Sequence, residues 1–249
     1  LYVSSKDQNP NLRLNNKKNS FQVYLKNAEN LYLSLKKKGF KFKIITNNKK
    51  KIKKNLNFKI EVQEIKFNTY VPKDINFYSA HYKIDVYKYF SLKKGYHALI
   101  DLDMLAINSI PNIFKFYLKN KINLLFNLNS SYKKKNKIHN KKILNSLKIC
   151  NRLENNTAEW YGGEFVVGNH KFFNYIYKKI KTLYKNYLAN YKRLHHQGDE
   201  MLLNSSIQVL KHNRNFKFKE ISNNKIITRY WSINTISEQR PLSFHLKHF

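Results

Sequence analysis

The sequence predicts an α/β fold with a mostly parallel central sheet flanked by helices. Strand-like and helix-like segments alternate through the first hundred residues, which is the pattern of such a sheet with its covering helices. The chain has 249 residues, of which 42% are hydrophobic, so it is long enough and apolar enough to bury one sizeable core. It contains no internal repeat and no Pro- or Gly-rich linker, and we therefore expect a single domain over residues 1–249.

Two helices and four strands are expected in the first hundred residues. Residues 20–35 carry apolar side chains at steps of three and four, which is one face of a helix, and Gly39 is suited to end it. Residues 77–90 carry a similar apolar stripe, which ends at Lys93-Lys94-Gly95. Alternating or continuous apolar residues mark the strands, which we expect at 1–5, 40–46, 58–67 and 96–100.

The second half of the sequence is less regular. A strand is expected at 122–126, and a short apolar strand follows the paired glycines within 160–168. Residues 170–191 show a strong helical spacing of aromatic and aliphatic side chains, and 198–210 form a shorter helical segment. Residues 130–156 are polar and lysine-rich, and we expect them to be mobile at least in part.

The formal net charge of +33 is extreme and has three interpretations. A basic surface binds nucleic acid by releasing counterions, and it also binds anionic lipid. The third interpretation is compositional drift, because Lys, Asn and Ile are all abundant. The lysines are scattered and no nucleic-acid motif accompanies them, so drift together with a membrane surface is favoured over nucleic acid.

Composition and motifs also exclude some classes of protein. Cys150 is the single cysteine, so no internal disulfide forms, and a small buried side chain is a better reading than a nucleophile. No apolar run approaches the roughly 18–20 residues that span a bilayer. No Gly-rich loop precedes the first helix, which weighs against a dehydrogenase or an ATPase. The expected location is cytoplasmic, or peripheral on the inner face of a membrane.

The most informative motif is Asp101-Leu102-Asp103, which directly follows the apolar strand at 96–100. Ligands bind where the strands of an α/β sheet end, and two carboxylates there can hold one hard cation against a diphosphate. Such a pair also arises when one acid caps a turn and the other faces water, and the spacing alone supports both readings equally.

Three later segments carry further candidate groups. Gly162-Gly163 lets a ligand approach the backbone closely, and Trp160-Tyr161 before it offers flat rings on which a sugar stacks, although a tight turn with two core aromatics explains the segment as well. Asp199-Glu200 opens a helix, where acids are favoured by the helix dipole alone. The C-terminal segment holds His245, Lys247 and His248, and a neutral imidazole there is a candidate third metal ligand.

In this order, the segments resemble the GT-A class of nucleotide-sugar-dependent glycosyltransferases, over nearly the whole chain. His245 resembles the late histidine of family 8, the glycogenin-like and lipopolysaccharide galactosyl- and glucosyltransferases, where it joins the two aspartates on Mn²⁺. Tyr161-Gly162-Gly163 and Asp199-Glu200 resemble family 6, the blood-group-like α-galactosyl enzymes. Family 8 chains continue from that histidine into a Gly- and Lys-containing tail, whereas this sequence ends at Phe249, so His248 stands as a second candidate ligand.

The resemblance implies a Rossmann-like GT-A domain whose nucleotide-binding half is 1–107 and whose acceptor-binding half is 108–249. It implies that Mn²⁺ or Mg²⁺ binds the donor diphosphate, most simply that of a UDP-sugar, through Asp101, Asp103 and His245. It implies a retaining transfer to a glycan or lipid-linked acceptor. The competing function is that of a non-catalytic basic protein that binds nucleic acid or an anionic membrane.

The resemblance also implies roles for the remaining candidates. Ser4, Ser5 and Lys83 lie near the nucleotide, and Lys247 meets a phosphate. Gly162 and Gly163 line the sugar site. Asp199 and Glu200 are the expected catalytic residues, one of which touches the acceptor or stabilises an oxocarbenium-like centre.

Overall fold

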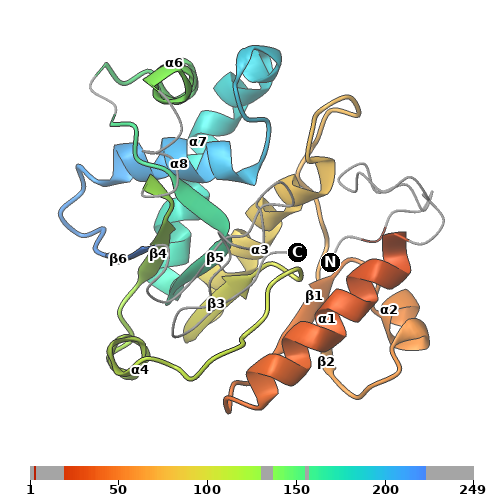
Figure 1. The fold of residues 1–249 in the computed structure, drawn as a ribbon. Helices are drawn as coiled ribbons and strands as arrows, with labels where there is room; N and C mark the ends of the chain where they lie inside the picture. The colour runs from red at the N-terminus through yellow and green to blue at the C-terminus, as the bar shows by residue number, and fades with distance from the viewer. Residues whose placement is uncertain (1–2, 4–19, 130–136, 155–156, 223–249) are drawn as a thin grey trace.

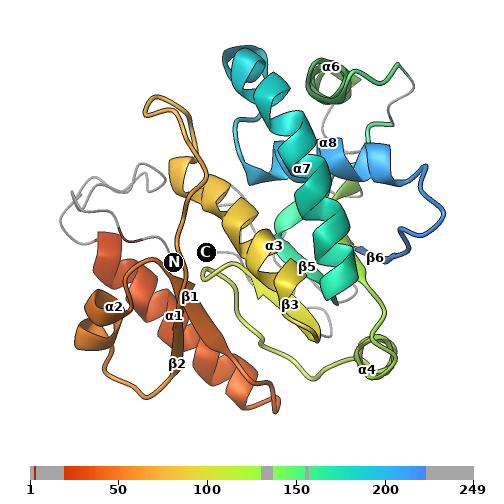
Figure 2. The same ribbon diagram turned by 180° about the vertical axis from the view of Figure 1, so that it is seen from behind.

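A computed structural model describes Val3 and residues 20–129, 137–154 and 157–222, and these residues have the expected α/β architecture (Figures 1 and 2). The strands of the described residues form two separate sheets, one with two strands and one with four. Of the expected opening strand only Val3 is described, and its backbone N–H and C=O both hydrogen-bond to the side chain of Asn47, at 2.8 and 3.0 Å.

The smaller sheet consists of β1 (Lys43–Thr46) and β2 (Glu61–Glu64), which pair in parallel. Helix α2 (Lys49–Asn55) connects them and begins after Asn48, whose side chain accepts from the Lys51 N–H and so caps the helix. Helix α1 (Ser20–Lys36) packs onto this unit. The resulting small apolar cluster contains Val3, Leu25, Ala28, Ile44, Ile52 and Val62.

The larger sheet has the strand order β3-β5-β4-β6 and is mixed. Its strands are β3 (Tyr96–Ile100), β4 (Leu124–Asn127), β5 (Tyr161–Asn169) and β6 (Lys219–Ser222). The long strand β5 lies in the middle and is antiparallel to both neighbours, and only β4 and β6 pair in parallel. The expectation of a single, mostly parallel central sheet therefore needs correction. Apolar runs mark buried strands but carry no information on strand direction, which non-local pairing decides.

Helices cover the larger sheet and complete the main core. Helix α3 (Lys83–Leu92) and helix α7 (His170–Asn190) lie in front of the sheet in Figure 2. Helix α7 also packs against α6 (Lys137–Asn151) and α8 (Asp199–Leu210), and it continues into the short helix η3 (Tyr191–Arg193). Among the described residues, no helix is both long and apolar enough to cross a membrane.

Strongly periodic segments agree with the sequence expectations, whereas lysine-rich ones do not. The helices near 20–35, 170–191 and 198–210 and the strand at 96–100 are confirmed. The helix expected at 77–90 begins later, because Phe77 has a left-handed φ of 54° and a 3₁₀ helix, η2 (Tyr78–Tyr82), precedes α3. The linker before 58–67 contains α2, and the segment expected to be mobile contains α6, which buries Ile143, Leu147 and Cys150. Helix α4 (Asn112–Lys119) and β6 were not expected.

His81 in η2 attaches this short helix to α7. Its side chain is fully buried, its Nδ1 lies 3.0 Å from the Phe77 carbonyl oxygen and its Nε2 lies 2.7 Å from the Tyr187 hydroxyl. A carbonyl oxygen only accepts, so Nδ1 donates to Phe77, and in the neutral imidazole that burial favours Nε2 accepts from the Tyr187 hydroxyl. Burial lowers the pKa of His81 below its usual 6.5, outweighing the opposing effect of the Phe77 carbonyl.

Neutral His81 makes the stability of the fold depend on pH. The unfolded chain binds a proton at His81 more readily than the folded chain does, so the free energy of unfolding falls as the pH falls below 6.5. We expect His81→Gln to remove this component of the pH dependence and to cost about 1–3 kcal/mol at neutral pH through the lost hydrogen bonds. Urea unfolding of both proteins between about pH 5 and about pH 7 measures this. The exposed His212 supplies the control: if His212→Gln flattened the profile equally, the assignment to His81 would be wrong.

Candidate active site

The ammonium group of Lys83 joins three of the predicted site residues. Its Nζ lies 2.7 Å from Asp101 Oδ1, 2.8 Å from Asp199 Oδ2 and 3.0 Å from the carbonyl oxygen of Gly163, to which it donates. The side chains are largely removed from solvent, with exposed fractions of 15% for Lys83, 27% for Asp101 and 8% for Asp199. Residues that are far apart in the sequence therefore form one buried ionic cluster, which we call the Lys83 cluster: Lys83, Asp101, Gly163 and Asp199.

Each member of the cluster stands at the end or at an irregular point of its element. Lys83 is the first residue of α3, Asp101 follows the last residue of β3, and Asp199 is the first residue of α8. The Asp101 N–H still donates to the Glu164 carbonyl at 3.0 Å, which extends the β3–β5 pairing to the edge of the cluster. Helix and strand ends leave backbone groups and side chains available for ligands, so this is the part of the fold where a ligand can be bound.

Strand β5 is irregular where it meets the cluster. Leu125 of β4 lies opposite Val166, but the next residue, Phe126, lies opposite Gly162, so β5 bulges between these two pairs. The bulge places the Gly163 carbonyl against Lys83, and the Gly163 N–H lies 3.4 Å from Glu200 Oε1. A β-carbon on Gly163 would overlap the Asp199 carboxylate and come within 3.2 Å of the Glu200 side chain. Glycine is therefore required here by close packing of α8 on the strand.

The pKa values of the cluster show an excess of negative charge. Burial lowers the pKa of Lys83, but the carboxylates of Asp101 and Asp199 more than compensate and hold it well above its usual value. Burial raises the pKa of Asp101 to about 6, Lys83 opposes this shift, and the charges of Asp103 and Asp199 add to it. Both pKa values are therefore raised, which favours the charged form of Lys83 and the neutral form of Asp101. Two carboxylates, those of Asp101 and Asp199, share the one ammonium group.

Glu200 is held in a different way from Asp199. Its Oε2 accepts a 2.8 Å hydrogen bond from the indole N–H of Trp160, and its side chain is nearly buried, at 7% exposure. Asn204, one turn along α8, donates to the carbonyls of Glu200 and Tyr161 and accepts from the Tyr161 N–H at 2.7 Å. These bonds attach α8 to β5 and fix the first turn of the helix beside Gly163. The hydrogen bond from Trp160 thus orients the Glu200 carboxylate.

Of the two interpretations of Trp160 and Tyr161, the structure supports the one in which both are core aromatics, and their faces are not open to a sugar. Trp160 is 2% exposed and Tyr161 is fully buried, because both belong to the core beneath α8. The exposed aromatic surface beside the site comes from Phe77, which is 47% exposed and stacks on the His196 ring at 5.1 Å with an interplanar angle of 3°. His196 in turn stands edge-on to Trp160, and its Nε2 lies 3.9 Å from Glu200 Oε2.

Phe77, His196 and Asn204 were not predicted as site residues. The segment 197–204 was singled out for its acids, and nothing in the spacing distinguished Asn204 from a surface position. In the sequence, only the nearby Gly198 marked His196. In the structure, a β-carbon on Gly198 would come within 2.8 Å of the His196 imidazole. Contacts between residues 77 and 196 depend on the packing of η2 against the start of α8, which no local pattern reveals.

The candidate metal ligands are only partly covered by the described residues. Asp103 lies near enough to Asp101 for its charge to raise the Asp101 pKa. Within the described ranges, no group of three or more His, Cys, Asp or Glu side chains has the geometry to hold a metal ion. Five candidate residues lie outside the described residues: Ser4, Ser5, His245, Lys247 and His248. Both candidates for the third metal ligand, His245 and His248, are among them.

Comparison with known proteins gives no relative: no protein-family model matches the chain, and no curated protein sequence matches it.

The Lys83 cluster makes a specific prediction about stability. Lys83→Met removes the cation and leaves Asp101 and Asp199 buried without compensation, which we expect to destabilise the fold by about 3–5 kcal/mol. Adding Asp101→Asn and Asp199→Asn to that variant removes the uncompensated charges, so most of the lost stability should return. Chemical unfolding at neutral pH measures all three proteins, with the exposed Lys88→Met on the same helix as the control. A triple variant as unstable as Lys83→Met alone would contradict the ionic description.

Proposed function

We propose that this protein is a metal-dependent glycosyltransferase of the GT-A type, which transfers a sugar from a nucleoside-diphosphate sugar to a glycan or lipid-linked acceptor. A UDP-sugar is the expected donor. The observation that carries the proposal is the Lys83 cluster, in which the strand-end acid Asp101, the paired glycine Gly163 and the helix-start acid Asp199 meet. The resemblance to glycosyltransferases rests on these segments. It concerns their order in the sequence and did not require that their residues contact one another.

The distribution of acidic residues also supports a ligand site at this place. The chain has 48 basic residues and only 15 acidic ones. Five of the acids nevertheless lie on the segments that meet around Lys83: Asp101, Asp103, Glu164, Asp199 and Glu200. Carboxylates gathered at one site of a very basic protein are suited to a task that a cationic surface cannot perform, such as holding a metal ion.

The residues present fit a hard divalent cation in type and in charge. Asp101 and Asp103 supply the oxygen donors that Mn²⁺ and Mg²⁺ accept. Burial raises the pKa of Asp101 to about 6, and the charges of Asp103 and Asp199 add to this shift. In this proposal Asp101 and Asp103 would hold the ion, which would lie beside the donor diphosphate. A bound cation supplies charge stabilisation to the departing nucleoside diphosphate.

The chain's own residues then divide the remaining tasks. Lys83 orients the Asp101 and Asp199 carboxylates through two short ion pairs. Gly163, with no side chain, lets the Asp199 carboxylate and Glu200 lie directly against strand β5. Asp199 is the carboxylate nearest the transfer step, whereas Glu200, bonded to Trp160, is a positioning residue. Phe77, stacked on His196, offers the apolar face of an acceptor sugar a flat surface.

The metal requirement tests the proposal. We expect purified protein with Mn²⁺ to hydrolyse or transfer from a UDP-sugar, and Asp103→Ala to lower that activity by at least about a hundredfold, because a ligand to the charge-stabilising ion is lost. Asp74→Ala is the matched control, since Asp74 is an exposed acid paired with Lys192 and Tyr191 away from the cluster. Thermal unfolding of each variant shows whether it folds, and a shift by UDP-sugar only in the presence of Mn²⁺ shows donor binding directly. Full activity of Asp103→Ala, or activity that persists in EDTA, would contradict the proposal.

A further inference from the structure

A second surface lies at the lower end of the molecule in Figures 1 and 2, away from the Lys83 cluster. It is built by the C-terminal half of α1, the segment 105–107 that follows Asp103, and α4. The chain between Ile107 and α4 runs along this end. We call it the α1–α4 face and define it by six residues: Leu33, Lys37, Lys38, Ile107, Ile113 and Phe116.

Four large apolar side chains of this face are exposed to solvent. Leu33 is 45% exposed and Ile107 is 44% exposed, while Ile113 and Phe116 of α4 are 51% and 54% exposed. Ile113 and Phe116 are three residues apart and so lie on one side of the helix, whereas Phe114 between them is buried and anchors α4 to the core. Exposed apolar residues of this size are typical of a surface that contacts a partner.

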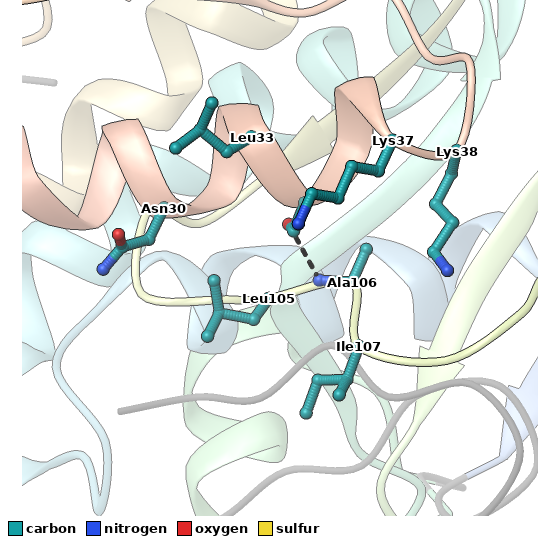
Figure 3. A pocket seen from close by; sticks show the side chains of 8 residues that line it. Asn30, Leu33, Lys37, Lys38, Leu105, Ala106 and Ile107 are labelled. Atoms are coloured by element: carbon teal, nitrogen blue, oxygen red, sulfur yellow. Dashed lines mark hydrogen bonds between the residues drawn. The ribbon is translucent and has the colours of Figure 1, made fainter.

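A cavity of about 300 Å³ opens on the α1–α4 face (Figure 3). Leu33, Leu105, Ala106 and Ile107 supply an apolar lining, and Lys37 and Lys38 stand at one end of it. A hydrogen bond of 3.0 Å from the Ala106 N–H to the Ser34 hydroxyl holds its two walls together. An apolar lining with two ammonium groups at one end matches a ligand that has an anionic head and an apolar body.

The two stretches of sequence that contribute to this face are rich in lysine. Residues 30–60 contain 11 lysines and no acid, and residues 104–153 contain 10 lysines, one arginine and no acid. The two stretches include every residue of the α1–α4 face. In the described part of the chain, Lys37, Lys38, Lys115 and Lys119 form no ion pair with a carboxylate. Their charges are therefore available to an anionic partner.

We propose that the α1–α4 face docks on the surface of an anionic phospholipid bilayer, with Ile113, Phe116, Leu33 and Ile107 in the interface and the lysines on the headgroup phosphates. Exposed aliphatic and aromatic side chains framed by lysines are the pattern of a peripheral membrane-binding surface. A nucleic acid would match the lysines but would leave Ile107, Ile113 and Leu33 without an apolar environment. The proposal does not depend on the glycosyltransferase activity, since none of its residues belongs to the Lys83 cluster.

Vesicle binding tests the docking surface. We expect the protein to co-sediment with phosphatidylcholine vesicles that contain about one-third phosphatidylglycerol, and far less with pure phosphatidylcholine. Ile113→Ser with Phe116→Ser should weaken the partition at least about tenfold, because both apolar anchors are lost. Lys37→Gln with Lys38→Gln should weaken it about 25-fold, at roughly fivefold for each lysine near the surface.

Matched controls separate this face from the general positive charge. Lys181→Gln with Lys185→Gln removes the same charge from the exposed side of α7, whose later turns lie at the opposite end of the molecule in both views. At about 0.1 M salt charges are screened beyond roughly 10 Å, so this pair should change the partition by less than about twofold. Tyr70→Ser removes a 71%-exposed aromatic side chain outside the face and should have no effect.

Three results would overturn the proposal. The first is an equal loss of vesicle binding for the α7 pair and the Lys37/Lys38 pair, which would show that binding is diffuse. The second is full binding by the Ile113/Phe116 variant. The third is salt-sensitive binding of duplex RNA that depends on Lys37 and Lys38, without binding to anionic vesicles, which would make this a nucleic-acid surface.

Discussion

The burial of one ammonium group constrains the arrangement of the site. An unpaired Lys83 so far from solvent would cost several kcal/mol in lost hydration, and Asp101, Asp199 and the Gly163 carbonyl offset that cost only when all three lie within hydrogen-bonding distance. The start of α3, the end of β3, the bulge of β5 and the start of α8 must therefore occupy fixed relative positions. A loss of any one contact leaves a buried charge uncompensated, so the cluster favours a single arrangement of these elements over alternatives of similar compactness.

The packing behind the cluster depends on the same geometry. Asn204 bonds to both backbone groups of Tyr161, and Glu200 bonds to the Trp160 indole, so the first turn of α8 is attached to the start of β5 by neutral and charged hydrogen bonds. The absence of a side chain at Gly163 allows this approach, and the bulge turns its carbonyl toward Lys83. As a consequence, Trp160 and Tyr161 are buried, and their rings pack against α8 and do not face the site. The same strand thus supports α8 and provides the carbonyl that Lys83 contacts.

Local periodicity was sufficient for part of the fold, whereas the site candidates came from short motifs and from the resemblance to glycosyltransferases. The helix at 170–191 follows from spacing alone, because it buries one stripe of apolar residues. The strand at 96–100 follows from its continuous apolar run, although its side chains are only partly buried. Lys83, Asp101, Gly163 and Asp199 were all candidates before the fold was known, and their contact confirms that they are neighbours, although their roles stay predictions. The direction of β5 was not accessible, since an apolar strand pairs equally well in either sense. Helices α2 and α6 were missed because lysines and asparagines dominate them, and the few buried residues that hold them, such as Ile52 and Leu147, are too sparse to form a visible pattern.

The charge distribution connects the two surfaces. Compositional drift toward lysine, at every position that tolerates it, would explain a basic protein. Such drift would also remove acidic residues evenly along the chain. Asp199 and Glu200 instead remain at positions that are 7% and 5% exposed, where each satisfies a buried partner, and their replacement would leave Lys83 or Trp160 unsatisfied. The lysines of α1 and α4 face no such requirement, because solvent or an anionic partner satisfies them equally. A protein of this charge attracts anions over its whole surface. In the proposed function, the carboxylates of Asp101 and Asp199 around Lys83 would let the site hold a cation within that field.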